Sequence, residues 1–426
     1  MIFSLCVTSV IISKFTKSEN VPLPENQLDT DKFLNYAKDA LAHSILMSTK
    51  RKLKICFWGN AASALQGRNK GGGELQIALL AKSLAKAGHS VTLIDSEFKE
   101  NETVIEGVRI LPVSGWNEGV RVLRMLTRRI PQLYRELLDE KADIYYVRMP
   151  SHWNLIPYLA AKKLGAAFVI GCSADLEAGD FWTRVHYFYL MNHEYYRLLS
   201  VALPTEMITP YLFRHAQLVI AQHDGQVAAF RKKGIQSKVF PNLVDIKKLH
   251  SVRSTEKEGF IFVGSLDVSK GLRELIQIAS LSPHSKFTVV GQPRGRRSGP
   301  LVESLRSLPN VEYLGRLDHD STIEQIGKSK ALLCTSRFEG FPNIFLEAWS
   351  VGTPVISLAV DPDGVIEREN LGIVCHGDLN KFVELLSRGT LQFDRDHLNQ
   401  YVVKYHAFEH AAKKFESIIG DLTEKR

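Results

Sequence analysis

The chain has 426 residues, of which 45% are hydrophobic and 23% charged. This composition is typical of a folded protein of about two to three domains, and it excludes a single small module, a disordered chain and a fibrous rod. The five cysteines lie far apart without CxxC spacing, which excludes a disulfide framework and a zinc site and favours a reducing compartment. We therefore expect a cytoplasmic protein.

Residues 1–13 form an apolar run that is shorter than the roughly 20 residues of a membrane-spanning helix. The run lacks a basic start and a small-residue cleavage site, so a signal peptide is not expected. Residues 18–31 have the composition of a linker. Residues 1–50 are predicted to be an N-terminal extension that is poorly ordered in part and does not belong to the fold.

A first series of strands and helices fills residues 51–243. The expected strands are 53–58, 90–95, 143–147, 167–171 and 218–221, and the expected helices are 74–87, 121–138 and 155–164. Apolar strands that alternate with helices predict a parallel sheet covered by helices.

A second series follows a charged hinge at 245–258 and fills residues 244–399. Strands are expected at 260–264, 287–291, 311–314 and 331–335, with a helix at 272–280. The amphipathic stretch 397–420 could pack on either domain, and residues 400–426 are expected to complete the first. The predicted fold class is α/β, with two Rossmann-like doubly wound domains facing across a cleft, where ligands bind at the carboxyl ends of the strands.

Net charge gives a first indication of partners. It is +8 overall, but residues 51–245 hold 25 Lys and Arg against 18 Asp and Glu, an excess of +7. Within residues 120–130, Arg121, Arg124 and Arg128 stand beside apolar residues. This pattern favours peripheral contact with anionic lipid, and a solvated basic face is the alternative. No interleaved basic and aromatic motif indicates nucleic-acid binding.

Two carboxylates, Glu339 and Glu347, straddle a predicted strand-to-helix turn that contains Gly340 and Pro342. A helix that begins at Pro342 or Asn343 offers N–H groups to an anion, and carboxylates accept hydrogen bonds from sugar hydroxyls. The combination predicts a nucleotide-sugar site. The alternative is a solvated loop carboxylate and a surface helix residue.

Residues 262–272, 241–245, 339–347 and 352–356 resemble, in the expected order, the retaining group-1 (GT4-like) glycosyltransferases of GT-B fold. The resemblance implies that Glu347 binds the nucleotide ribose, that Glu339 contacts the transferred sugar and that Lys270 neutralises the diphosphate. It implies further donor-site residues, namely Gly264, Ser265, Gly291, Gly340, Phe341, Pro342 and Asn343.

One position departs from the family pattern. Ser265 stands where the family usually has an arginine, so one charge on the diphosphate is missing. Arg294, Arg296 and Arg297 are candidates to replace it, and a basic surface loop is the alternative.

The first domain supplies the remaining candidates. Gly71, Gly72 and Gly73 resemble the family loop that approaches the donor diphosphate and the acceptor, with a simple flexible turn as the alternative. Arg148, His152 and Asp175 follow predicted strand ends and are candidates for the acceptor side, with structural hydrogen bonding as the alternative. No general base is assigned.

The residues and the resemblance together predict a hexosyltransferase-type enzyme that moves a sugar from a nucleoside-diphosphate sugar to a glycan or lipid-linked saccharide in cell-surface polysaccharide biosynthesis. Retention at the anomeric carbon is what the resemblance implies. The sequence predicts no cofactor and no essential metal, since chance explains the Asp-x-Asp triples at 318–320 and 361–363. The alternatives are a sugar-nucleotide epimerase of the same fold and a non-catalytic binding protein. A nicotinamide dehydrogenase is disfavoured because GxGxxG is missing.

Overall fold

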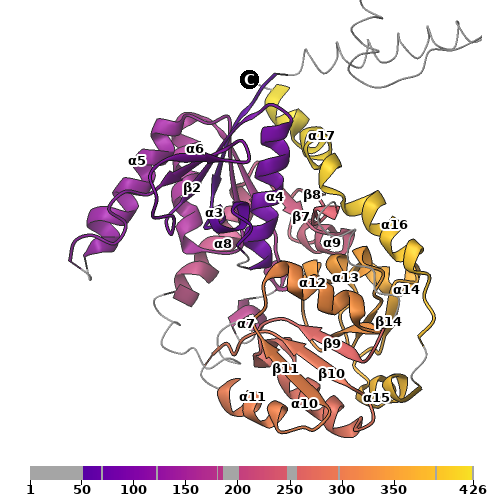
Figure 1. The fold of residues 1–426 in the computed structure, drawn as a ribbon. Coiled ribbons are helices and arrows are strands. Elements are labelled where there is room, and N and C mark those ends of the chain that lie inside the picture. Colours follow the sequence, from indigo (N-terminus) through magenta and orange to yellow (C-terminus); the bar gives the residue numbers. More distant parts are fainter. Residues whose placement is uncertain are drawn as a thin grey trace, which may run out of the picture. The chain divides into compact units, whose positions relative to one another are not determined.

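The computed structural model describes residues 51–68, 71–120, 123–179, 181–185, 201–246, 257–295, 298–388 and 391–424. The extension predicted over residues 1–50 lies outside them. Leu53–Arg426 forms one compact unit that contains two separate β-sheets (Figure 1).

The first sheet has eight strands in the order β3-β4-β2-β1-β5-β6-β7-β8. All neighbours are parallel except β3 and β4, which form an antiparallel pair at one edge. The carboxyl ends of the parallel strands therefore lie along one edge of the sheet. The strands are β1 (Lys54–Trp58), β2 (Ser90–Asp95), β3 (Thr103–Ile105), β4 (Val108–Pro112), β5 (Ile144–Arg148), β6 (Ala167–Gly171), β7 (Leu218–Ala221) and β8 (Ser237–Val239).

Helices cover both faces of this sheet, because the strands are buried on both sides and read as continuous apolar runs. The longest, α4, begins after the extended Gly71 and buries Ile77, Leu80 and Leu84. The helices are α3 (Ala62–Leu65), α4 (Gly72–Lys86), η2 (Met125–Arg129), α5 (Ile130–Glu140), η3 (His152–Asn154), α6 (Leu155–Leu164), η4 (Asp175–Ala178), α7 (Phe181–Val185), α8 (Leu203–His215) and α9 (Asp224–Arg231).

The second sheet has six parallel strands in the order β11-β10-β9-β12-β13-β14. They are β9 (Phe260–Val263), β10 (Phe287–Val290), β11 (Val311–Gly315), β12 (Ala331–Cys334), β13 (Val355–Ser357) and β14 (Gly372–Val374). Its helices are η9 (Val268–Lys270), α10 (Leu272–Leu281), α11 (Ser298–Arg306), α12 (His319–Lys328), α13 (Asn343–Ser350), η10 (Pro362–Gly364), α14 (Val365–Arg368) and α15 (Leu379–Arg388).

The C-terminal helices run from the second sheet to the first (Figure 1). α16 (Arg395–His406) places Leu398 and Val402 in the core around α13. α17 (Ala411–Glu424), reached through η11 (Phe408–His410), places Phe415 and Ile419 in the core beside α4. The amphipathic stretch expected over 397–420 thus consists of two helices that pack on different cores, and the chain breaks between them at the extended Ala407.

The prediction of two α/β domains built on parallel sheets is confirmed, and all nine expected strands agree with the structure to within one residue at each end. The stretch 121–138 is corrected, since η2 and α5 together run from Met125 to Glu140. The β3–β4 pair and the short strands β8, β13 and β14 were not predicted. Within the described part of the chain, no helix is long and apolar enough to cross a bilayer.

Candidate active site

The turn between β12 and α13 carries the first acid. Glu339 lies in the loop, and its Oε1 forms an ion pair with Nζ of Lys270 from η9. The Lys270 backbone is fixed at both ends, because its N–H donates to Asp267 Oδ1 (3.0 Å) and its carbonyl accepts from Thr335 Oγ1 (2.8 Å). Burial alone would lower the pKa of Lys270, but the charge of Glu339 outweighs it and raises the pKa. The ammonium therefore stays charged.

The second acid lies just over one turn into α13. Glu347 is buried, and its Oε1 is 3.3 Å from Nε2 of His319, the first residue of α12. This hydrogen bond raises the pKa of His319. The two acids thus have different partners, a lysine for Glu339 and a histidine for Glu347.

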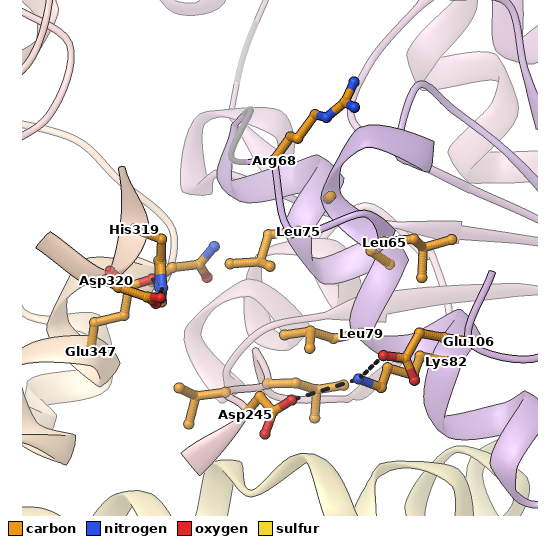
Figure 2. Close-up of a pocket in the computed structure, with 16 residues that line it drawn as sticks. Leu65, Arg68, Leu75, Leu79, Lys82, Glu106, Asp245, His319, Asp320 and Glu347 are labelled. Carbon is orange, nitrogen blue, oxygen red and sulfur yellow. Dashed lines mark hydrogen bonds and ion pairs between the residues drawn. The ribbon is translucent and has the colours of Figure 1, made fainter. Parts of the chain in front are cut away.

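Glu347 lines a pocket of about 410 Å³ between α4 and the helices α12 and α13 (Figure 2). The pocket does not include Glu339 or Lys270 in its lining. Arg68 belongs to it, but its side chain points away from Glu347 in Figure 2. The lining residues are Ala64, Leu65, Gly67, Arg68, Leu75, Ala78, Leu79, Lys82, Glu106, Leu243, Val244, Asp245, His319, Asp320, Asn343 and Glu347.

The starts of two helices meet at this pocket. Asn343, the first residue of α13, donates from Nδ2 to the carbonyl of Gly72, the first residue of α4 (3.0 Å). Gln76, one turn further along α4, donates to Asn343 Oδ1 (3.2 Å). Because each helix start carries a partial positive charge, their meeting creates a place that favours an anion. The structure therefore brings Gly71–Gly73 next to the Glu339–Glu347 turn.

Asn242, which follows β8, connects the two halves of the fold. The first half is built on the eight-stranded sheet and the second half on the six-stranded sheet. The Asn242 Oδ1 accepts from Arg148 (2.7 Å) and Gln222 (3.0 Å), and its Nδ2 donates to the Phe341 carbonyl (2.7 Å) and to Asn343 Oδ1 (2.8 Å). An amide side chain can make four such bonds, so the buried Asn242 is fully satisfied. Phe341 is itself buried, which makes it a packing residue of the turn.

The three acceptor-side candidates have different surroundings. Arg148 is buried against Asn242 and lies inside the link between the halves. His152 Nδ1 is 3.3 Å from Thr205 Oγ1 on α8, and burial lowers its pKa. Asp175 keeps 45% of its side chain exposed, and its N–H donates to the Glu339 carbonyl (3.3 Å). Of the three, Asp175 is the one that contacts Glu339.

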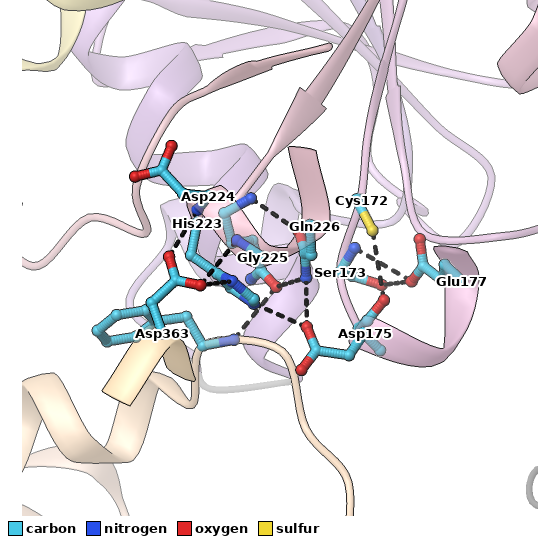
Figure 3. A network of polar contacts seen from close by, with 12 residues as sticks. Cys172, Ser173, Asp175, Glu177, His223, Asp224, Gly225, Gln226 and Asp363 are labelled. Atoms are coloured by element: carbon cyan, nitrogen blue, oxygen red, sulfur yellow. Dashed lines mark hydrogen bonds and ion pairs between the residues drawn. The ribbon is translucent and has the colours of Figure 1, made fainter. Parts of the chain in front are cut away.

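His223, which sequence reasoning missed, joins Asp175 to the second half (Figure 3). Its Nε2 is 2.7 Å from Asp175 Oδ1, and its Nδ1 is 3.0 Å from Asp363 Oδ1 in η10. Asp363 also accepts from the N–H groups of Asp224 (2.6 Å) and Gly225 (2.7 Å) at the start of α9. Burial alone would lower the pKa of His223, but the two carboxylates outweigh it and raise the pKa. We call these contacts of Asp363 the His223 clasp.

Glu177 is a further acid, and the sequence did not single it out. It is buried in η4 and accepts from the Ser173 N–H (3.1 Å), while its Oε2 has no partner. Burial raises its pKa to about 7. Nothing in its sequence neighbourhood distinguishes it, since the signal is burial alone.

The loops after β9 and β10 hold the remaining donor candidates. Gly264 and Gly291 lie on adjacent strand ends, where the Gly264 N–H donates to Val290 and the Gly291 N–H to Gly315. Ser265 donates from Oγ to Asp267 Oδ2 (2.8 Å), and Asp267 is the residue that caps the turn holding Lys270. Arg294 is exposed in the loop after β10, and Arg296 and Arg297 lie outside the described residues.

Three aspartates of the two Asp-x-Asp triples have partners within the protein. Asp318 caps α12 through the Ser321 N–H (2.9 Å), Asp361 accepts from the Ile366 N–H (2.8 Å), and Asp363 belongs to the His223 clasp. Across the ranges that the structure describes, no group of three or more His, Cys, Asp or Glu is placed to hold a metal ion.

Gly340 allows the turn to approach the first half closely. A Cβ at this position would lie 2.0 Å from Gln222 Oε1 and 2.9 Å from the Ser173 carbonyl. Replacement of Gly340 by alanine should therefore push the turn away from the first half and lower kcat/KM about tenfold, since misplacement by about 1 Å is costly in an active site. Gly299→Ala is the matched control, because a Cβ there meets nothing within 4 Å. Steady-state kinetics of both variants would check this, and equal activities would contradict it.

Comparison with known proteins identifies the family of the chain. A family model described as "Glycosyltransferase Family 4" matches residues 70–248, and one described as "Glycosyl transferases group 1" matches residues 257–389. An uncharacterized glycosyltransferase of Methanocaldococcus jannaschii is 25% identical over 167 residues, which are 34% of this chain and 41% of that protein. The chain spans about two fifths of the length of the curated relatives that it matches.

Solved structures share the fold over most of the chain. Sucrose-phosphate synthase from Thermosynechococcus elongatus superposes with a TM-score of 0.68 at 15% identity, over 88% of this chain and 100% of that one. WaaG, a glycosyltransferase involved in lipopolysaccharide biosynthesis, gives 0.62 at 19% identity, over 86% and 99%. The two parallel sheets are thus those of the GT-B fold, and the chain belongs to the group-1, GT4-like glycosyltransferases.

Proposed function

We propose that the protein transfers a hexose or related sugar from a nucleoside-diphosphate sugar to a glycan or lipid-linked saccharide. The observation that carries this proposal is the meeting of the starts of α4 and α13 at Gly72 and Asn343. Asn343 lines one pocket with Glu347, and Glu339 of the same turn is paired with Lys270. The helix starts favour a diphosphate, Glu347 suits ribose hydroxyls, and Glu339 suits hydroxyls of the sugar.

The chemistry follows from where the charges lie. As the bond from the anomeric carbon to the diphosphate breaks, negative charge grows on the leaving oxygen, and Lys270 and the helix starts stabilise it. With Ser265 in place of an arginine, Lys270 carries a larger share of this task. The leaving phosphate would accept the proton of the acceptor hydroxyl on the same face of the sugar, which gives retention. The anomeric configuration of the product, read by NMR, tests this step.

A screen of nucleoside-diphosphate sugars for thermal stabilisation is the direct test of the donor site. A ligand at about 100 times its Kd adds about 2.7 kcal/mol to the free energy of unfolding, so the true donor should raise Tm clearly. Glu347→Ala should abolish the shift, whereas Glu324→Ala, on the exposed face of α12, should keep it. Failure of every donor to shift the wild type would contradict the proposal.

The alternatives predict different products. An epimerase of the same fold would convert the donor to a new nucleotide sugar without any acceptor, and a binding protein would be stabilised by the donor without turnover on any acceptor. Incubation with the stabilising donor, first alone and then with a panel of glycan and lipid-linked acceptors, separates the three. We favour transfer in cell-surface polysaccharide biosynthesis, supported by the likeness to WaaG.

We also propose that the reaction needs no metal ion, since Lys270 and two helix starts provide the positive charge that a divalent cation supplies elsewhere. Treatment with EDTA should therefore leave kcat/KM within about twofold of the untreated enzyme. Mg²⁺ added back after EDTA is the control. A loss of activity with EDTA that Mg²⁺ restores would contradict this.

A further inference from the structure

A segment after β4 exposes apolar side chains next to arginines. Val120 is 67% exposed, Leu123 53%, Met125 42% and Leu126 69%, which places four exposed large apolar residues within seven positions. Single exposed apolar residues are ordinary on protein surfaces, but a contiguous group marks a contact surface. We call these four residues the apolar face.

The segment is held in this orientation by its inward side. The Arg129 guanidinium lies 5.0 Å from the ring centre of Trp116 and donates to the Trp116 carbonyl (2.8 Å), and Trp116 packs 5.0 Å from Trp153. The backbone is helical, because the N–H groups of Arg124 and Thr127 donate to carbonyls four residues earlier. The apolar face is thus presented to solvent by an anchored turn.

Charge identifies the partner. Residues 114–130 contain four arginines and one acid, Glu118. Arg128 is exposed, and Arg124 is half-buried beside the apolar face. Burial and the nearby Arg124 charge lower the pKa of Arg129. Apolar side chains that sink into the acyl boundary, with arginines at headgroup level, are the composition that binds an anionic bilayer surface.

The position of the segment relates it to the acceptor side. It follows β4, and β4 and β5 end at the same edge of the sheet, where Trp153 lies next to His152. We propose that the apolar face and Arg124 and Arg128 dock the protein on an anionic lipid surface and bring this edge close to acceptors carried by lipid. The class of acceptor rests on the proposed function, whereas the docking does not.

Sedimentation with vesicles, without donor or acceptor, tests the docking separately from transfer. The full chain should bind phosphatidylcholine vesicles that contain about 30% phosphatidylglycerol, should not bind pure phosphatidylcholine, and should dissociate as salt rises from about 0.05 to 0.5 M. Leu123→Ser with Leu126→Ser should weaken binding at least about tenfold, and Arg128→Gln about fivefold.

Leu281→Ser in α10 is the matched control, since Leu281 is 52% exposed and lies in the other half. It should bind as the wild type does. Any contribution of residues 1–13 is common to all variants, and unchanged Tm values would show that each is folded. Equal binding by the double variant, or no binding to anionic vesicles, would overturn the proposal. So would a wild-type dimer that the double variant converts to a monomer without any vesicle binding, because the face would then join two copies.

Discussion

Replacement of Lys270 by alanine is expected to lower kcat about 10²–10³-fold, the range seen when one preorganised group that stabilises a growing negative charge is removed. Lys270 places a full positive charge next to Glu339 in the proposed site, whereas Ser265, which is bonded to Asp267, supplies none. Lys270→Arg keeps the charge but changes its reach, so it should recover part of the rate. Initial rates at saturating donor give the comparison.

The control for this experiment is another lysine with a glutamate partner. Lys286 pairs with Glu258 at 3.1 Å, but both side chains are more than three quarters exposed, and such surface pairs contribute little. Lys286→Ala should keep the wild-type rate. If Lys270→Ala lowered Tm so far that the loss of folded protein explained the lower rate, the ion pair would be structural. If it kept the full rate while still folded, the proposed role of Lys270 would be wrong.

The fold was largely predictable because its strands are buried on both faces and stand out as apolar runs between amphipathic helices. The short strands β8 and β14 were not predicted, because three residues carry no periodic pattern. The break at Ala407 was not predicted for a different reason. The apolar residues of α16 and α17 form one amphipathic pattern, and only their packing on two different cores shows that the chain turns between them.

The candidate site was predictable where the residues are close in sequence. Glu339, Asn343 and Glu347 share one turn, so their spacing carried the prediction. His223 and Asp363 are 140 residues apart and belong to different halves of the fold, so no local pattern could pair them. Arg148 was expected on the acceptor side because it follows a strand, but the structure buries it against Asn242, a contact across 94 residues that sequence spacing does not reveal.

The His223 clasp predicts that the contact between the two halves depends on pH. Both ring nitrogens of His223 face carboxylate oxygens, which only accept, so the ring must carry two protons to satisfy both. Its folded-state pKa is raised above the ordinary 6.5. The stabilisation is therefore complete below about pH 6.5 and is lost as pH rises through the raised pKa. The two halves should separate more easily at alkaline pH, and kcat/KM should fall there.

Asp363→Ala removes the acceptor of three hydrogen bonds. It should shift the two halves toward a separated arrangement by at least about 10–100-fold, which corresponds to the loss of one bond to a charged group at about 1.5–3 kcal/mol. His223→Gln should keep part of the activity but remove the alkaline fall in the pH–rate profile. Glu367→Ala is the matched control, since Glu367 pairs with His376 at 3.0 Å within the second half alone. Small-angle scattering at pH 6 and pH 9 would report the opening directly. An unchanged profile in His223→Gln, with the same scattering at both pH values, would mean that other contacts such as those of Asn242 hold the halves together.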